Sequence, residues 1–344
     1  ESKYPPTSQY YIDQGLERLA KTIGKYKKGD RKMTGVSGLS EDDLLDLDKC
    51  ISESTIDKGT RFIDTSKKKK KKTIFNLFEG FRFPYEEKQY DDEVVDEVSI
   101  PTCDKIKPWI DHIINVICKG DRKMARKFIQ WMAHIVQKPT EKSFAMILYG
   151  KQGTGKSIMY EFFKNCIGDG YGLQISKLED LTQTHNKIVR GRLIVNCNEA
   201  TNYPTVKDVN ILKGFITETD LLVNPKGCPL YYVSNYARLM ITTNCKFAMR
   251  LTPDDRRWCC LEISEKKKNN DEYFEPLITT MKDEDTLREF FTYLANFDIS
   301  DYKSQRPPMT ALKRDMISVQ LPHMIDFMKE VCENGTHSEY DEDT

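Results

Sequence analysis

The chain has 344 residues, of which 39% are hydrophobic, so it can form two or three domains with a substantial core. Lysine and arginine together number 53, as do aspartate and glutamate, and the formal net charge is therefore zero. This balance excludes a protein that coats DNA through its bulk charge, although a local basic patch or groove can still bind nucleic acid.

Cysteine usage and hydropathy indicate the compartment. The ten cysteines include no C-x-x-C pair and no Cys/His cluster with zinc spacing. The sequence has no signal peptide and no apolar run of about 18 residues, so no membrane partner is expected. We expect reduced thiols and an intracellular location. The first residue, Glu1, is not methionine, as expected for a fragment, a processed product or a subset of a larger protein.

Residues 1–73 form a polar N-terminal segment or linker whose fold the sequence does not indicate. Its most distinctive feature is a run of lysines at residues 67–72. Such a run can contact a phosphate backbone, but a solvated loop is the more ordinary interpretation of a block of like charges.

Residues 74–140 are predicted to form a small, collar-like helical domain. Apolar side chains recur at three- and four-residue spacing over residues 106–117 and again over 124–136. The first series ends near Gly120 and the second stops before Pro139, and both residue types are common at helix ends. The pattern predicts two amphipathic helices that pack as a small bundle.

Residues 141–265 alternate short apolar strands with helices, which is typical of an α/β fold with a parallel sheet. A polar loop at residues 266–270 opens the last region, residues 266–344, which is predicted to be helical. The predicted strands are residues 144–149, 193–196, 239–243 and 258–263, and the predicted helices of the last region are residues 287–295, 309–318 and 323–332.

The strongest motif is Gly-Lys-Gln-Gly-Thr-Gly-Lys-Ser at residues 150–157, which fits the phosphate-binding pattern G-x-x-x-x-G-K-[ST], or Walker A. An apolar strand precedes it and a helix follows, as this pattern requires. Lys156 is predicted to reach the β- and γ-phosphates of ATP, and the Ser157 hydroxyl to hold Mg²⁺. The motif alone does not separate kinases, GTPases and motors. The predicted ATP-binding residues are Gly150, Gln152, Gly153, Thr154, Gly155, Lys156 and Ser157.

The second motif is the strand-like stretch 193–197, which is apolar except for Asn196 and is followed by Asn198 and Glu199. A strand that ends in an acidic residue is the Walker B arrangement, in which a carboxylate meets Mg²⁺ and the attacking water. Glu199 is the candidate for polarising that water. Asn198 stands where many motors have aspartate. Its neutral amide can still order a Mg²⁺-bound water, but it adds no negative charge to the metal site. The predicted metal site is Ser157, Asn198 and Glu199; the alternative is that Glu199 only caps a strand.

Two further elements follow in the chain. The strand 239–243 ends at Asn244, whose side chain is predicted to sense the γ-phosphate, although asparagine ends many strands. Arg256 and Arg257 come next. An arginine delivered to the γ-phosphate of a neighbouring subunit would stabilise transition-state charge. The alternative for two arginines beside aspartates is a plain surface ion pair.

A predicted hairpin distinguishes a helicase from other motors. It follows a helix at residues 206–215, and two β-prone runs flank Asn-Pro-Lys-Gly at residues 224–227. Lys226 would lie at its tip, where it could contact DNA phosphate inside a ring channel. The alternative is an ordinary surface hairpin.

Taken together, these motifs resemble superfamily III helicases in order and spacing, with an AAA+-like P-loop ATPase core. The likeness is closer to the helicase part of primase–helicase proteins from large DNA viruses, virophages and phages. It extends over residues 74–330 and includes the segments 75–81, 131–139 and 308–310.

The resemblance implies a homo-hexameric ring that hydrolyses ATP with Mg²⁺ and moves 3′ to 5′ on single-stranded or forked DNA. It implies catalytic roles for Glu199, Lys156, Asn244 and one arginine, with Lys226 as the DNA contact. Arg257 is favoured over Arg256 because it directly precedes the aromatic residue that opens the next strand. A primase domain or polymerase would lie outside this chain, at viral or plasmid replication sites in the host cytoplasm or nucleus.

Two alternatives remain open at this stage. One is a different P-loop DNA motor, such as a packaging or remodelling ATPase. The other is a nucleotide-binding replication scaffold with little turnover, which the neutral residue Asn198 suggests.

Overall fold

The computed structural model describes residues 62–64, 73–75, 80–91, 94–182, 187–198, 206–223, 231–249, 251–318 and 332. Most of the predicted N-terminal segment lies outside these residues, as does the predicted helix 323–332 except for its last position. Glu199 and Lys226 also lie outside them. Among the described helices, none has both the length and the apolar character needed to cross a membrane.

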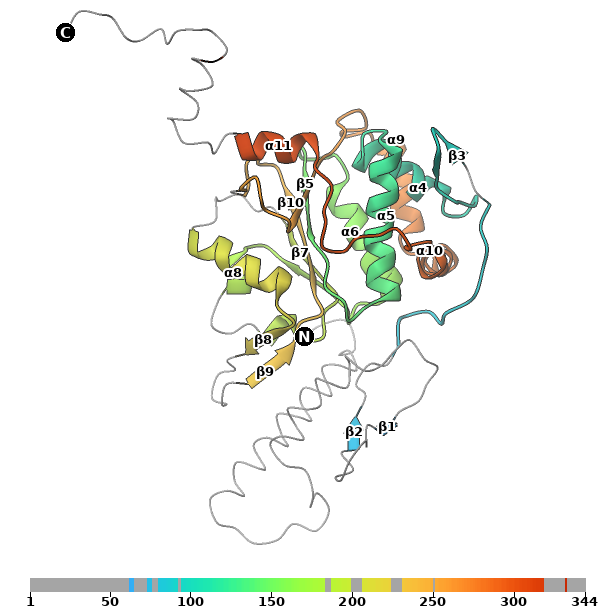
Figure 1. Cartoon of the computed structure of the whole chain (residues 1–344). Coiled ribbons are helices and arrows are strands. Elements are labelled where there is room, and N and C mark those ends of the chain that lie inside the picture. Colours follow the sequence, from blue (N-terminus) through green and yellow to red (C-terminus); the bar gives the residue numbers. More distant parts are fainter. Residues whose placement is uncertain are drawn as a thin grey trace, which may run out of the picture.

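Five parallel strands form the central sheet, in the order β11-β5-β10-β7-β6 (Figure 1). The predicted α/β fold with a parallel sheet is therefore confirmed. The prediction missed β6, a short strand that begins with glycine. The strands are β5 (Ala145–Tyr149), β6 (Gly172–Ile175), β7 (Ile194–Asn198), β10 (Arg238–Thr243) and β11 (Trp258–Glu262).

The position of β10 determines what meets at the edge of the sheet. It lies between β5 and β7, so that Thr242 is opposite Leu148 on one side and Asn198 on the other. Because all these strands are parallel, their carboxyl ends lie at the same edge. The ends of β5, β7 and β10 therefore lie next to one another, although they are far apart in the sequence.

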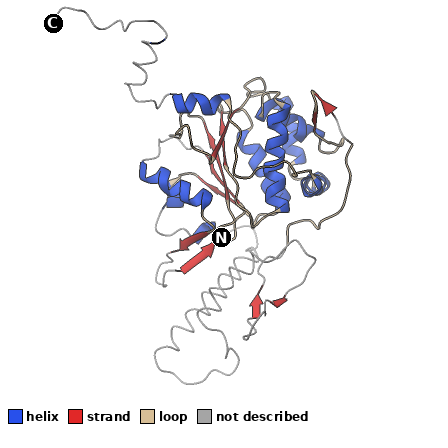
Figure 2. Ribbon diagram, viewed as in Figure 1, coloured by secondary structure: helices blue, strands red, loops and turns tan. Residues whose placement is uncertain are grey.

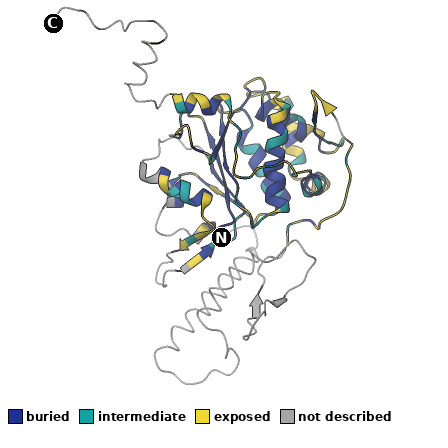
Figure 3. Ribbon diagram, in the orientation of Figure 1, coloured by how far each residue is buried: buried dark blue, intermediate teal, exposed yellow. Residues whose placement is uncertain are grey.

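Helices cover both faces of the sheet (Figures 1 and 2). Along β5, Met146 and Leu148 pack in one core cluster and Ala145 and Ile147 in another, as expected for a strand buried on both faces. Figure 3 shows the strands of the central sheet as almost entirely buried. The first face carries α4 (Lys107–His112), the π-helical turn η1 (Ile113–Ile117), α5 (Arg122–Gln137), α6 (Lys156–Ile167), α9 (Asp271–Thr280) and α10 (Glu284–Asn296). The second face carries α7 (Glu179–Thr182), α8 (Val206–Thr217) and α11 (Ala311–Ser318).

The helices before and after the sheet share the core of the first face. The Trp109 ring stacks on Phe162 of α6 with ring centroids 3.6 Å apart, and Phe162 in turn contacts Phe290 of α10. The Trp109 indole N–H donates to the Thr280 hydroxyl at 3.1 Å. The segment expected to form a collar-like domain thus packs directly against α6, α9 and α10.

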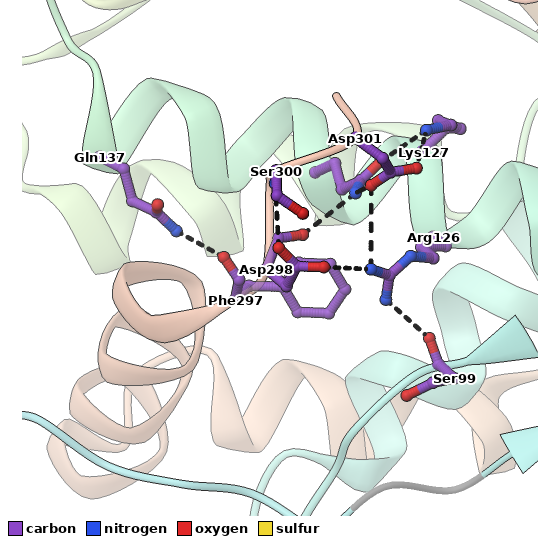
Figure 4. A network of polar contacts seen from close by, with 9 residues as sticks. Ser99, Arg126, Lys127, Gln137, Phe297, Asp298, Ser300 and Asp301 are labelled. Carbon is purple, nitrogen blue, oxygen red and sulfur yellow. Dashed lines mark hydrogen bonds and ion pairs between the residues drawn. The ribbon is translucent and has the colours of Figure 1, made fainter. Parts of the chain in front are cut away.

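A polar network at the surface also joins α5, which precedes the sheet, to the segment that follows α10 (Figure 4). The Arg126 guanidinium donates to the Asp298 carboxylate at 2.8 Å and to the Ser99 carbonyl at 2.9 Å. Beside it, the Lys127 ammonium donates to the Asp301 carboxylate at 2.8 Å. Each exposed ion pair contributes little alone, but the network fixes α5 to the segment that follows α10.

The remaining described strands form small two-stranded ribbons. The predicted hairpin is confirmed as antiparallel β8 (Asp220–Val223) and β9 (Tyr231–Ser234). The helix α9 was not predicted, because Pro276 interrupts its pattern. Its start is nevertheless well capped, since the Asn270 side chain accepts from the Tyr273 N–H at 2.9 Å. The other ribbons are β1 (Phe62–Asp64) with β2 (Thr73–Phe75) and β3 (Val94–Val95) with β4 (Val98–Ser99), and a 3-10 turn, η2, spans Lys187–Val189.

Candidate nucleotide-binding site

The loop 150–157 lies between the end of β5 and the start of α6, at the carboxyl edge of the sheet. Gly153 and Gly155 have φ angles of 79° and 87°, in the region that favours glycine. The Thr154 hydroxyl donates to the Lys151 carbonyl at 2.8 Å, which closes the loop on itself. Gln152 is exposed at the surface of the loop. The helix that follows directs its free N–H groups and the positive end of its dipole toward the loop.

Neighbouring parts of the chain pack closely against Gly153 and Gly155, so a side chain at either position would meet them. A Cβ atom at Gly155 would lie 2.6 Å from Phe274 Cε1 and 2.9 Å from His112 Cε1. A Cβ atom at Gly153 would lie 1.9 Å from the Asn269 side-chain oxygen. The Asn269 N–H also donates to the Gly153 carbonyl at 3.0 Å. These supporting residues were missed in the sequence, because only the folded chain brings them to the loop.

His112 is fully buried behind the loop. Its Nδ1 atom lies 3.1 Å from the Tyr273 hydroxyl, and burial lowers the pKa of His112 to about 4. The imidazole is therefore neutral at pH 7. A neutral ring adds no positive charge of its own beside the loop.

Lys156 is almost buried, with 8% of its surface exposed. Its ammonium group donates to the carbonyls of Gly150 at 2.6 Å and Lys151 at 2.8 Å, and to the Asn244 side-chain oxygen at 2.9 Å. Three protein oxygens thus surround the lysine. The contact with Asn244 joins the loop to the end of β10.

Ser157 faces the end of β7. Its hydroxyl donates to the Asn198 side-chain oxygen at 3.3 Å, and that same oxygen accepts from the Thr242 hydroxyl at 2.8 Å. Among the described residues, no cluster of three or more His, Cys, Asp or Glu side chains could hold a metal ion. Ser157 and Asn198 nevertheless offer two hard oxygen donors, which suits Mg²⁺ because this ion often takes few protein ligands and completes its shell with phosphates and water.

The structure therefore brings four predicted site residues together. These residues, Lys156, Ser157, Asn198 and Asn244, come from the loop, α6, β7 and the end of β10. Hydrogen bonds join Lys156 to Asn244 and Ser157 to Asn198. This arrangement of an ammonium, a hydroxyl and two carboxamides can bind a phosphate group and a divalent cation.

The two arginines lie elsewhere. Arg257 directly precedes β11, and its carbonyl accepts from the Ala145 N–H at 2.8 Å, at the amino end of β5. At about 3.3 Å per residue, the length of β5 separates this position from the loop by roughly 13 Å. The Arg257 guanidinium is half-buried and lies 3.8 Å from the buried Asp255 carboxylate, whereas Arg256 is exposed.

The hairpin also belongs to the amino edge of the sheet. Its second strand leads through residues 235–237 into the first residue of β10, and Figure 1 shows it far from α9 and α11. The Asn235 side chain donates to the carbonyls of Phe215 at 2.7 Å and Glu218 at 3.0 Å, which fixes the base of the hairpin to the end of α8. Leu222 and Tyr232, paired across the two strands, are exposed on its outer face.

Two cationic side chains, Arg238 and Lys142, join the start of β10 to the segment that follows α5. Arg238 is fully buried and donates to the carbonyls of Lys138, Pro139 and Tyr236, and burial lowers its pKa to about 9. The Lys142 ammonium donates to the Ala237 carbonyl at 2.7 Å, and burial sets its pKa well below the usual range. Their sequence context gave no sign of this role.

Comparisons with known proteins show a likeness to a phage replication protein. Residues 148–257 match the model of a family of unknown function, DUF5906. Over 203 residues, the chain is 27% identical to the DNA primase-polymerase of Nitratiruptor phage NrS-1. That match covers 57% of this chain but only 27% of the length of the phage protein.

Solved structures show the same likeness in three dimensions. The apo structure of the NrS-1 C-terminal region (305–718) matches with a TM-score of 0.61 and 19% identity, covering 81% of this chain and 67% of that one. An A-form apo structure of the same region also has a TM-score of 0.61 and covers 82% of this chain and 66% of that one. The chain therefore has the fold of the C-terminal region of the NrS-1 protein, and part of its sequence is similar to that phage's DNA primase-polymerase.

Proposed function

We propose that this chain is the ATP-hydrolysing helicase part of a DNA replication protein, of the superfamily III type. The observation that carries the proposal is the cluster at the carboxyl edge of the sheet. There, Lys156 and Ser157 of the phosphate-binding loop meet Asn198 and Asn244, from the two strands that follow it in the motif order.

Each residue of the cluster has a distinct part in the proposed hydrolysis of ATP. Lys156 exchanges its contact with Asn244 for the β- and γ-phosphates, and Asn244 then lies close enough to report on the γ-phosphate. Ser157 and Asn198 hold Mg²⁺, which when bound neutralises the phosphate charge. Glu199 follows Asn198 directly in the sequence and polarises the attacking water.

The placement of the arginines supports action between subunits. Arg256 and Arg257 lie at the amino edge of the sheet, so they cannot serve the loop of their own chain. In a homo-hexameric ring, this edge would face the ATP of a neighbouring subunit, where an arginine stabilises transition-state charge. The hairpin that carries Lys226 lies at the same edge and would line a channel for single-stranded DNA.

The similarity to a phage DNA primase-polymerase supports a role in copying a viral or plasmid genome. We infer that the ring acts on single-stranded or forked DNA, moves 3′ to 5′, and works inside the cell with a primase or polymerase supplied by residues beyond this chain.

ATP hydrolysis with and without single-stranded DNA, forked-duplex unwinding and the particle mass with nucleotide test the proposal together. We expect DNA-stimulated hydrolysis, unwinding and a six-fold mass. DNA-stimulated hydrolysis without unwinding would instead indicate a packaging or remodelling ATPase.

A second candidate, a nucleotide-binding replication scaffold with little turnover, is favoured by one observation. Asn198 supplies no negative charge beside Ser157, where a carboxylate would strengthen the hold on Mg²⁺. Tight ATP binding with no hydrolysis, with or without DNA, would support this candidate over the helicase.

A further inference from the structure

The Asn198 carboxamide has a particular orientation in this site. Its oxygen accepts from two hydroxyls at once, that of Thr242 at 2.8 Å and that of Ser157 at 3.3 Å. Thr242 is completely buried and lies directly opposite Asn198 in the pairing of β10 with β7. Its other acceptor within reach, the Cys197 carbonyl, is farther away at 3.5 Å.

This orientation matters because an amide has two different ends. A carboxylate presents an oxygen whichever way it is turned, whereas a half-turn of an asparagine side chain exchanges its oxygen for an NH₂ group. An NH₂ group facing Ser157 would donate to the hydroxyl and occupy a lone pair that a cation needs. It would also direct hydrogen atoms toward a positive ion.

We propose that Thr242 is a positioning residue for the cation site. Its hydroxyl holds the Asn198 oxygen toward Ser157, so that a neutral side chain can take the place that aspartate has in many motors. This inference rests on the proposed binding of Mg²⁺ and nucleotide. It assigns a function to a residue of β10 whose side chain was given no role in the sequence motifs.

The test measures the affinity of the purified chain for a fluorescent ADP analogue, once with Mg²⁺ and once with EDTA. Thr242→Val keeps the shape of the side chain and removes its hydroxyl. We expect it to reduce the gain in affinity due to Mg²⁺ by about fivefold, the effect of one hydrogen bond, and to leave the affinity in EDTA unchanged. Thr242→Ser, which keeps the hydroxyl, should retain most of the gain.

The second part of the test combines Thr242→Val with Asn198→Asp. A carboxylate has an oxygen at both ends, so it needs no partner to orient it. In the Asn198→Asp background, Thr242→Val should therefore change the gain in affinity due to Mg²⁺ by less than about twofold. Thr242→Ala replaces Thr242→Val if the latter does not fold.

Three outcomes are distinguishable. An equal loss of affinity in EDTA and in Mg²⁺ would overturn the inference, because it would show that Thr242 only supports the structure of the loop. An equal effect of Thr242→Val in the parent and in the Asn198→Asp background would overturn it as well. If the parent chain does not bind the nucleotide at all, the proposed function itself fails.

Discussion

At the scale of single residues, the surroundings of Lys156 suit the proposed binding of phosphate. Its ammonium is nearly buried, and three protein oxygens accept hydrogen bonds from it. A phosphate can replace these neutral acceptors with a charged one, which forms stronger hydrogen bonds. The phosphate-binding role of this lysine stays a prediction from the sequence, whereas its contact with Asn244 was not predicted.

Lys156→Ala should abolish ATP turnover while leaving the chain folded. The substitution removes the charge that faces the phosphates, and such losses slow phosphoryl transfer by orders of magnitude. Steady-state hydrolysis and the circular dichroism spectrum measure the two effects. Hydrolysis near that of the parent, in folded protein, would contradict the assignment of the loop.

His112 should make the stability of the chain sensitive to acid. Burial lowers its pKa in the folded state to about 4, from a usual value of 6.5. Between these two pH values the unfolded chain therefore binds a proton at His112 that the folded chain does not bind. This contribution to stability is complete above pH 6.5 and is lost as the pH falls toward 4, at up to about 1.4 kcal/mol per pH unit.

The measurement is the free energy of unfolding by urea at pH 8, 6 and 5 for the parent and His112→Gln. The variant should differ from the parent by an offset at pH 8 and by a shallower slope below pH 6.5. Parallel curves for the two proteins would show that His112 does not titrate on unfolding. His134, whose pKa burial also lowers to about 4, supplies part of the slope that remains.

At the scale of elements, most strands of the sheet and the position of the loop 150–157 between a strand and a helix could be predicted because their signals are local. β5, β7, β10 and β11 each contain consecutive apolar residues, and the loop is a contiguous motif. β6 was missed because Gly172 and the exposed Gln174 break its pattern. Thr242, His112 and Asn269 were missed for a different reason, since their contacts exist only once β10 lies beside β7 and α4 and α9 pack on the loop.

Gly155→Ala tests how firmly α4 and α9 fix the loop. The new methyl group would meet Phe274 and His112 at less than 3 Å, at a residue whose φ is 87°. Strain and crowding together should lower the free energy of unfolding by about 2–4 kcal/mol. They should also weaken nucleotide binding.

Two glycines provide matched controls for this variant. Gly191 has a φ of 69°, and no atom lies within 4 Å of the place that a methyl group would take, so Gly191→Ala measures backbone strain alone. Gly170 has open space and no positive φ, and Gly170→Ala should be nearly neutral. If Gly155→Ala lowers the free energy of unfolding no more than Gly191→Ala does, α4 and α9 can move away from the loop at little cost.

At the scale of the whole molecule, the two edges of the sheet have different tasks in the proposed ring. The carboxyl edge holds the nucleotide cluster, which is the group of Lys156, Ser157, Asn198 and Asn244. The amino edge carries the arginines and the base of the hairpin. Arg238 and Lys142 tie this amino edge to the end of α5 through backbone carbonyls. If the carboxyl edge binds ATP as proposed, a residue at the amino edge can act on a nucleotide only in a neighbouring subunit, and mixing two variants tests such an action directly.

Arg257→Ala and Lys156→Ala, each inactive alone, should restore activity when mixed. A random mixture in equal parts pairs an intact loop with an intact arginine at about one quarter of the interfaces of a ring. ATP hydrolysis across a series of mixing ratios, after proven subunit exchange, measures this. The same series with Arg256→Ala identifies the arginine involved, because Arg256 is exposed while Arg257 lies against Asp255. Activity that stays absent at every ratio in both series would remove the support for an arginine acting between subunits.

A substitution at Lys226 tests whether the proposed motor is a helicase. In the sequence this lysine lies in the turn between β8 and β9, whose base is fixed to α8 by Asn235. If this turn lines the channel, Lys226→Ala should leave basal ATP hydrolysis largely intact, because the hairpin lies at the opposite edge of the sheet from the loop. It should weaken forked-duplex unwinding and flatten the salt dependence of single-stranded DNA binding, by about one unit of slope for each phosphate that the lysine neutralised.

Lys226→Arg is the matched control, because holding a phosphate requires charge more than shape, and it should retain much of the unwinding activity. Single-stranded DNA affinity over a salt series and forked-duplex unwinding, measured on the same preparations, give the answer. Since each subunit of a ring contributes one hairpin, a small loss per lysine is multiplied around the channel and becomes measurable. If Lys226→Ala unwinds DNA as well as the parent and keeps the same salt slope, the hairpin is a surface turn. The packaging or remodelling ATPase would then be the better explanation of the nucleotide cluster.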